Sequence, residues 1–117
     1  MRTKCSFAMM VLLTLSASAS SGKKVFETYC WGCHHQTAVA FGPPFEAIAS
    51  HRSAEEIRAM IVDPNAVSKT FGYTRNAMPA FSLAEENLTA ITQYILSYKP
   101  DINQTIVKES NLTQGAK

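Results

Sequence analysis

The amino-acid sequence predicts an all-α protein with three to four helices. Apolar residues recur at helical spacing in three stretches, and two of these stretches open with a Ser-x-x-Glu pattern typical of a helix N-terminus. No run of alternating apolar and polar residues is long enough to indicate a sheet, and no internal repeat is visible. A chain of 117 residues allows one domain, so we expect the helices to share a single core.

The first helix is predicted over Gly22 to His35, where three apolar residues lead into a pair of cysteines. These apolar residues are Val25, Phe26 and Tyr29. The segment from Gln36 to Ser50 is predicted to be a rigid loop, because the consecutive prolines Pro43 and Pro44 exclude a continuing helix.

The second helix is predicted to begin after Ser53, which forms a capping box with Glu56, and to end at Asp63-Pro64. Residues 65–80 have no periodicity and are predicted to be irregular. The third helix is predicted from a second capping box, Ser82 with Glu85, to about Tyr98. It has the most regular apolar spacing of the three.

The two ends of the chain are predicted to lie outside the domain of residues 20–100. Arg2 and Lys4 precede a short apolar run and the sequence Ala17-Ser18-Ala19, a pattern typical of a secretory signal peptide cleaved near Ala19. The run is too short to span a bilayer, which needs about 20 apolar residues. Residues 101–117 form a polar tail with no predicted structure. We therefore expect an exported, periplasmic protein that is not inserted in a membrane.

The predicted mature chain is electrically neutral. Of the 11 Lys and Arg residues, two lie in the signal peptide, and the rest equal the 9 Asp and Glu residues in number. No basic run indicates binding to nucleic acid or to an anionic membrane surface.

The strongest motif is Cys30-Trp31-Gly32-Cys33-His34, because Cys-x-x-Cys-His is the attachment signature of a c-type haem. On a helix, residues three and four apart share a face, so both thiols and the imidazole would point the same way. A redox dithiol is a weaker interpretation because it expects a βαβ unit, and a zinc site would need a second ligand pair. The third cysteine, Cys5, belongs to the signal peptide.

From residue 22 to residue 99 the chain resembles the small monohaem class I c-type cytochromes. Besides the haem motif, Gly22 and Phe26 match the residues with which that family's N-terminal helix crosses its C-terminal helix, where Ile91 and Tyr94 match the partners. The resemblance implies a cytochrome c-like fold wrapped around one haem c, held by two thioethers and containing iron.

The resemblance also implies roles for residues outside the motif. The Pro43 carbonyl would accept a hydrogen bond from His34, and Met78, followed by Pro79, would be the iron ligand opposite His34. Tyr73 and Arg75 would hydrogen-bond a haem propionate or simply lie on an exposed loop. Three other outcomes for the sixth ligand stay open: Met60, which we expect in the core, His51, which we expect at the surface, and an open position.

This ligand set predicts an electron carrier rather than an enzyme. Its partners would be periplasmic redox proteins met transiently, a dehydrogenase or membrane complex as donor and a reductase or oxidase as acceptor. A haem enzyme or gas-binding module would follow if the sixth position were open. A dedicated haem subunit of a periplasmic dehydrogenase complex is the third interpretation, in which the tail of residues 101–117 would contact the enzyme.

Overall fold

A computed structural model describes residues 20–101, and every regular element in this part of the chain is a helix. In chain order the elements are α1 (Gly22–Val25), η1 (Phe26–Cys30), α2 (Phe45–His51), α3 (Ala54–Val62), α4 (Pro64–Val67) and α5 (Glu85–Leu96). The all-α prediction is therefore confirmed. The predicted signal peptide and nearly all of the polar tail lie outside the described residues. Within them, no helix is both long and apolar enough to cross a membrane.

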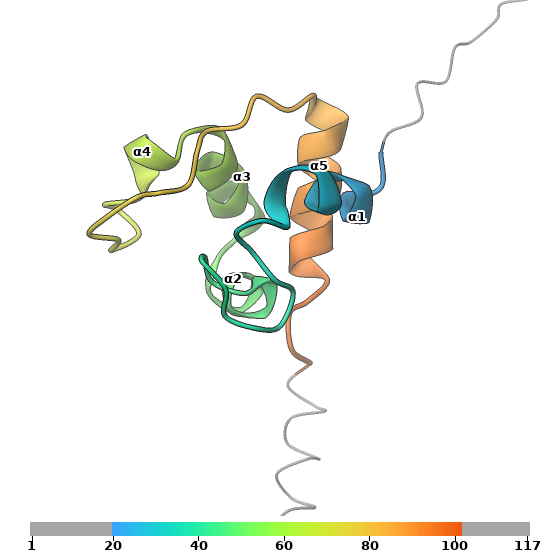
Figure 1. Ribbon diagram of the computed structural model, residues 1–117, viewed down its shortest axis with the longest axis horizontal. Coiled ribbons are helices and arrows are strands. Elements are labelled where there is room, and N and C mark those ends of the chain that lie inside the picture. The colour runs from blue at the N-terminus through green and yellow to red at the C-terminus, as the bar shows by residue number, and fades with distance from the viewer. Residues whose placement is uncertain (1–19, 102–117) are drawn as a thin grey trace, which may run out of the picture.

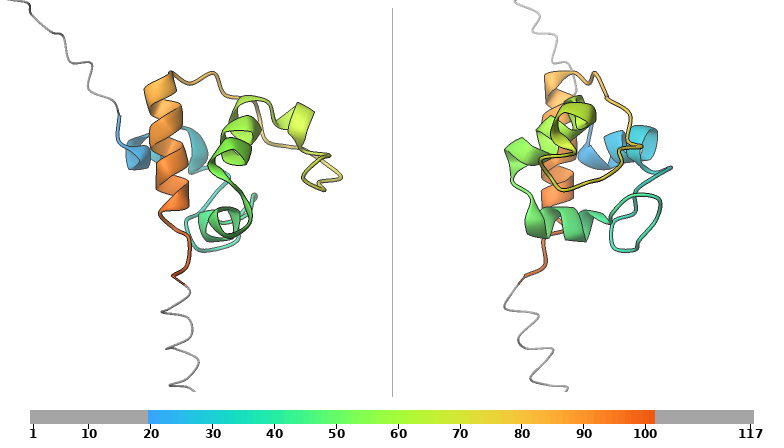
Figure 2. Two further views of the ribbon diagram at one scale, coloured as in Figure 1. Left: turned by 180° about the vertical axis from the view of Figure 1, so that it is seen from behind. Right: turned by 90° about the vertical axis from the view of Figure 1, so that its left-hand side faces the viewer.

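The helix α5 is the longest element, and α1 crosses it near its middle (Figure 1, Figure 2). Gly22 makes this crossing possible, because a Cβ at that position would collide with the Ala90 carbonyl oxygen and with the Tyr94 Cβ. One turn later, the Phe26 ring lies 5.8 Å from the Tyr94 ring. The predicted crossing of the N- and C-terminal helices is present.

The first helix ends earlier than predicted. After Val25 the helix continues as a single π-helical turn, η1. Here the Trp31 N–H donates to the Phe26 carbonyl, five residues earlier, at 2.9 Å. Residues 31–33 then form a turn, and the chain leaves the helical direction before His35. The helix predicted over Gly22 to His35 thus ends at Cys30.

One of the two predicted capping boxes is confirmed and the other is wrong. At α3, the Ser53 hydroxyl accepts from the Glu56 N–H at 3.2 Å, and the Glu56 carboxylate accepts from the Ser53 N–H at 2.8 Å. At α5, the N-cap is Ala84, and no side chain caps the helix. The Glu85 carboxylate instead pairs with Arg58 of α3, so it is directed toward another helix rather than back to Ser82.

Two short helices, α2 and α4, occur where the sequence predicted irregular chain. Each starts beside a proline: Pro44 is the extended N-cap of α2, and Pro64 is the first residue of α4, where the Asp63 carboxylate caps the Ala66 N–H at 3.1 Å. Proline is compatible with a helix start because the first N–H groups have no partner inside the helix. The prolines excluded a continuing helix but not a new one.

A single core cluster fills the space between α1, η1, α2, α3 and α5. Its buried members come from all five elements and include two rings in edge-to-face contact, with centroids 5.2 Å apart. They are Val25, Phe26, Phe45, Ile57, Ile61, Leu88, Ile91 and Ile95.

Candidate functional site

The Cys-x-x-Cys-His motif forms one tight turn immediately after η1. The Cys30 carbonyl accepts from both the Cys33 N–H, at 3.1 Å, and the His34 N–H, at 2.9 Å. These two bonds hold the three reactive side chains within a single turn of chain. The predicted helix does not continue through the motif, so Cys33 and His34 lie in and directly after a turn rather than on the face of a helix.

The two thiols have different surroundings. Cys30 is half-buried and packs against the core cluster, whereas Cys33 is exposed. Burial, with a smaller contribution from the neighbouring Cys33, raises the pKa of the Cys30 thiol to about 11. Cys30 thus faces apolar surroundings, which favour the neutral thiol over the thiolate.

The His34 ring is oriented by a carbonyl and by an aromatic ring. Its Nδ1 lies 2.8 Å from the Pro43 carbonyl oxygen, and its plane is stacked at 5.8 Å on the Phe45 ring of the core cluster. Because a carbonyl oxygen only accepts, this contact requires the proton on Nδ1, and in the neutral ring the lone pair is then on Nε2. The contact that the resemblance implied for Pro43 is present, and it leaves Nε2 as the ring nitrogen able to bind a metal.

The loop of residues 36–44 is closed by backbone hydrogen bonds that place Pro43 opposite the histidine. The Gly42 N–H donates to the Cys33 carbonyl at 2.7 Å, and the Phe45 N–H donates to the His35 carbonyl at 3.0 Å. Gly42 is required here, because a Cβ would lie 2.5 Å from the His34 Cε1. The chain therefore passes directly over the edge of the imidazole.

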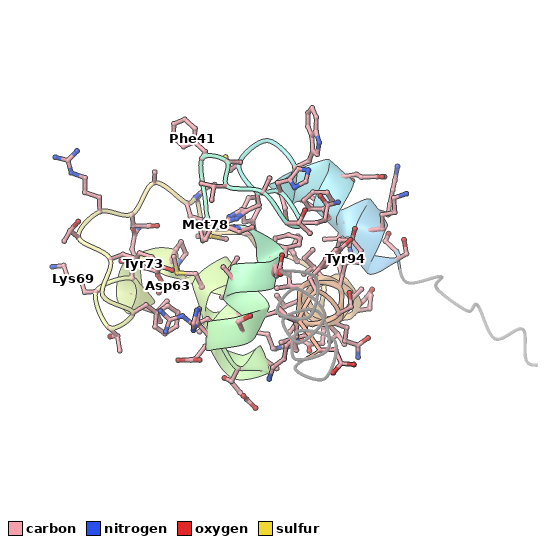
Figure 3. The ribbon with its side chains drawn as sticks, turned by 90° about the horizontal axis from the view of Figure 1, so that it is seen from below. Phe41, Asp63, Lys69, Tyr73, Met78 and Tyr94 are labelled. Atoms are coloured by element: carbon pink, nitrogen blue, oxygen red, sulfur yellow. The ribbon has the colours of Figure 1, made fainter. Side chains whose placement is uncertain are left out.

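Met78 lies on the long connection between α4 and α5. Its side chain is half-buried and packs against the same core cluster as Cys30. Downstream, the Phe81 N–H donates to the Ile61 carbonyl at the end of α3, at 2.9 Å. In the view of Figure 3, Met78 lies toward the middle of the molecule, while Lys69 lies at its outer edge.

The other residues singled out in the sequence are mostly at the surface. Tyr73 and Arg75 are both exposed on the loop that precedes Met78. His51 is exposed as expected, and His35 is exposed as well. The His35 ring also has a local role, because its Nδ1 accepts from two backbone N–H groups, those of Thr37 and Ala38, at 3.2 and 3.1 Å.

The expectation that Met60 lies in the core is wrong. Met60 is only half-buried and lies outside the core cluster, to which α3 contributes Ile57 and Ile61. Trp31 is 69% exposed and does not pack in the core. Phe41 is also exposed, and Figure 3 shows it at the tip of its loop.

Two residues of the site were not recognised in the sequence. Phe45 stacks on His34, and its only signal was its position directly after the two prolines. Asn76 binds the backbone of Met78 through its side-chain amide. An asparagine two residues before the methionine was a usable signal, because Asn side chains commonly bond to backbone groups two residues on.

Together, the helical fold and a turn bearing two thiols and one histidine are typical of a protein that holds a haem covalently. The profile of the cytochrome c family matches residues 19–99, and the chain belongs to that family. Among solved structures, a cytochrome c from Rhodothermus marinus is similar, with 25% sequence identity and a TM-score of 0.56. The similarity covers 66% of this chain and 72% of that one. No curated protein matches this chain significantly.

The cofactor of this family is haem c, bound covalently and containing iron, and the family serves haem-based electron transfer. The residues present fit this cofactor. Two unpaired thiols lie in one turn with an imidazole whose Nε2 is free to bind, and a soft thioether, Met78, borders the same core cluster.

Proposed function

We propose that this protein is an exported, periplasmic electron carrier with a single haem c, and that it is not an enzyme. In this proposal Cys30 and Cys33 form the two thioethers, and His34 and Met78 are the axial ligands of the iron. When bound, the haem supplies a one-electron couple between ferric and ferrous iron.

One observation carries the proposal: residues far apart in the sequence border a single core cluster. Cys30 and Met78 pack directly against it, and His34 is stacked on Phe45, one of its buried members. A nitrogen donor and a sulfur donor are therefore held by the same rigid core. This arrangement supports a pair of ligands that stay in place during electron transfer.

The surrounding residues keep these donors in position. The Pro43 carbonyl holds the His34 ring by its Nδ1 proton and increases the basicity of Nε2. Met78 provides a soft sulfur, which favours ferrous iron and raises the reduction potential. Tyr73 and Arg75 are our candidates for binding a propionate, since both are exposed on the loop before Met78.

The partners we propose are periplasmic redox proteins that bind transiently. A dehydrogenase or membrane complex would be the donor, and a reductase or oxidase would be the acceptor. Weak interfaces of this kind bury little area, typically below about 1,200 Å². The equal numbers of acidic and basic residues in the mature chain support steering by local charges rather than by net charge.

The decisive experiment compares Met78→Ala with Met60→Ala in exported, haem-containing protein. We expect wild type and Met60→Ala to show the thioether-to-iron charge-transfer band in the ferric state and to bind carbon monoxide poorly in the ferrous state. Met78→Ala should lose the band and bind carbon monoxide rapidly. Mass spectrometry should show one haem of added mass in all three proteins.

A different result would favour another function. If ferrous wild type bound carbon monoxide rapidly at neutral pH and its ferric form lacked the band, the iron would have an open position. The protein would then be a haem enzyme or a gas-binding module, and the carrier proposal would fail.

A further inference from the structure

The backbone of Met78 is held by one side chain, that of Asn76. The Met78 N–H donates to the Asn76 Oδ1 at 3.1 Å, and the Asn76 Nδ2 donates to the Met78 carbonyl at 3.1 Å. A single amide group therefore binds both polar groups of the methionine backbone. Rotating the Met78 backbone would break both bonds.

The orientation of the Asn76 amide follows from its partners. A backbone N–H only donates, so the atom that faces the Met78 N–H must be the amide oxygen. The amide nitrogen then faces two oxygens, the Met78 carbonyl and the Oδ1 of Asn65, the latter at 2.9 Å. All three contacts agree with this one orientation.

The contact with Asn65 connects Met78 to a fixed element. Asn65 is in α4, whose N-terminus is capped by Asp63 and whose first residue, Pro64, is fully buried. On the other side of Met78, the Phe81 N–H is bound to the Ile61 carbonyl. The methionine segment is thus tied to the α3–α4 region both before and after Met78.

We propose that Asn76, anchored by Asn65, is a positioning residue that holds the Met78 sulfur at the iron. This inference rests on the proposed function, because it requires Met78 to be the sixth ligand. Within Met78, Asn76 bonds only to the backbone N–H and carbonyl and not to the thioether. It acts by making the detached state of Met78 less populated.

The test measures how readily imidazole replaces Met78 in the ferric, haem-containing protein. Imidazole binds only when the methionine has left the iron, so its apparent affinity increases with the population of the detached state. Asn76→Ala removes two hydrogen bonds to the Met78 backbone, and the apparent affinity should increase about tenfold. Asn65→Ala should give a smaller increase in the same direction.

Two comparisons separate positioning from general destabilisation. Asn65→Asp keeps an acceptor for the Asn76 Nδ2, so its imidazole affinity should remain near that of wild type. Ser53→Ala removes the capping box of α3, which lowers stability without touching the methionine segment. Its imidazole affinity should also be unchanged, although its thermal midpoint should decrease.

The double variant Asn65→Ala/Asn76→Ala gives a further check. If the two residues act as one unit, it should bind imidazole no more tightly than Asn76→Ala alone. Should Asn76→Ala fail to yield folded protein, the comparison of Asn65→Ala with Asn65→Asp decides, since neither change touches Met78 directly.

The outcomes distinguish this inference from the proposed function. If wild type itself lacked the thioether band, Met78 would not be the ligand and the proposed function would fail. If wild type had the band and the Asn76→Ala and Asn65→Ala variants bound imidazole like wild type, Met78 would be a ligand held without Asn76. That result would overturn the inference alone.

Discussion

At the scale of single residues, the position of the His34 ring depends on two neighbours with different roles. The Pro43 carbonyl fixes the proton on Nδ1, and Gly42 gives the chain room to pass the ring. The first role was predicted by the resemblance to class I cytochromes. The second was not evident from the sequence, because the need for a missing Cβ depends on how closely the loop approaches the imidazole in space.

The close approach of Gly42 to the His34 ring can be tested by adding one methyl group, in Gly42→Ala. Gly42→Ala would place its Cβ 2.5 Å from the His34 Cε1, so the ring or the loop must move and the bond to Pro43 weakens. We expect a loss of about 1–3 kcal/mol in stability, the usual cost of overpacking. Thermal unfolding of the haem-containing protein, followed by haem absorbance, measures it.

Gly32→Ala is the matched control for this change. Gly32 lies in the haem motif, two residues before His34, but a Cβ there would meet nothing within 4 Å. We expect its unfolding midpoint to stay near that of wild type. Equal midpoints for Gly42→Ala and wild type would show that the loop adjusts without cost.

At the scale of helices, the sequence predicted what depends on local bonds and missed what depends on tertiary contacts. The Ser53 capping box is entirely local, and it was predicted correctly. The equivalent pattern at Ser82 failed because the Glu85 carboxylate is bound to Arg58, which is distant in sequence. Similarly, α2 was missed because its main stabilisation is the burial of Phe45 in the shared core rather than a capping side chain.

The close crossing of α1 and α5 predicts that a larger residue at Gly22 destabilises the protein. Gly22→Ala would gain about 1 kcal/mol of helix propensity, but its Cβ would collide with the Ala90 carbonyl, which belongs to a helix backbone and cannot move alone. Overpacking costs about 1–3 kcal/mol, so we expect a net loss of stability. Chemical denaturation should show a lower midpoint for Gly22→Ala than for wild type. Lys24→Ala, exposed on the same helix, should show little change, and a stabilised Gly22→Ala would contradict the close crossing.

At the scale of the whole molecule, the residues of the candidate site pack directly against the core cluster. The core cluster is small, and the partly buried residues that pack against it include Cys30 and Met78. Several large apolar side chains are exposed on the protein surface, among them Trp31 at 69%, Val39 at 85% and Phe41 at 89%. A domain of this size buries a limited fraction of its apolar surface, so any large apolar group attached to Cys30 adds substantially to its stability.

We therefore expect the fold to depend on covalent attachment. In the double variant Cys30→Ala/Cys33→Ala no thioether can form, and the chain loses the apolar contacts of the attached macrocycle while all of its other side chains remain. Because each Å² of buried apolar area contributes about 25 cal/mol and domain stabilities are only about 5–15 kcal/mol, this loss is large enough to remove cooperative folding. Far-ultraviolet circular dichroism should show reduced helicity and a broad thermal transition in this variant, against a sharp transition in the haem-containing wild type. Full native helicity with cooperative unfolding in the double variant would show instead that the core cluster folds the chain by itself and that the cofactor enters a preformed site.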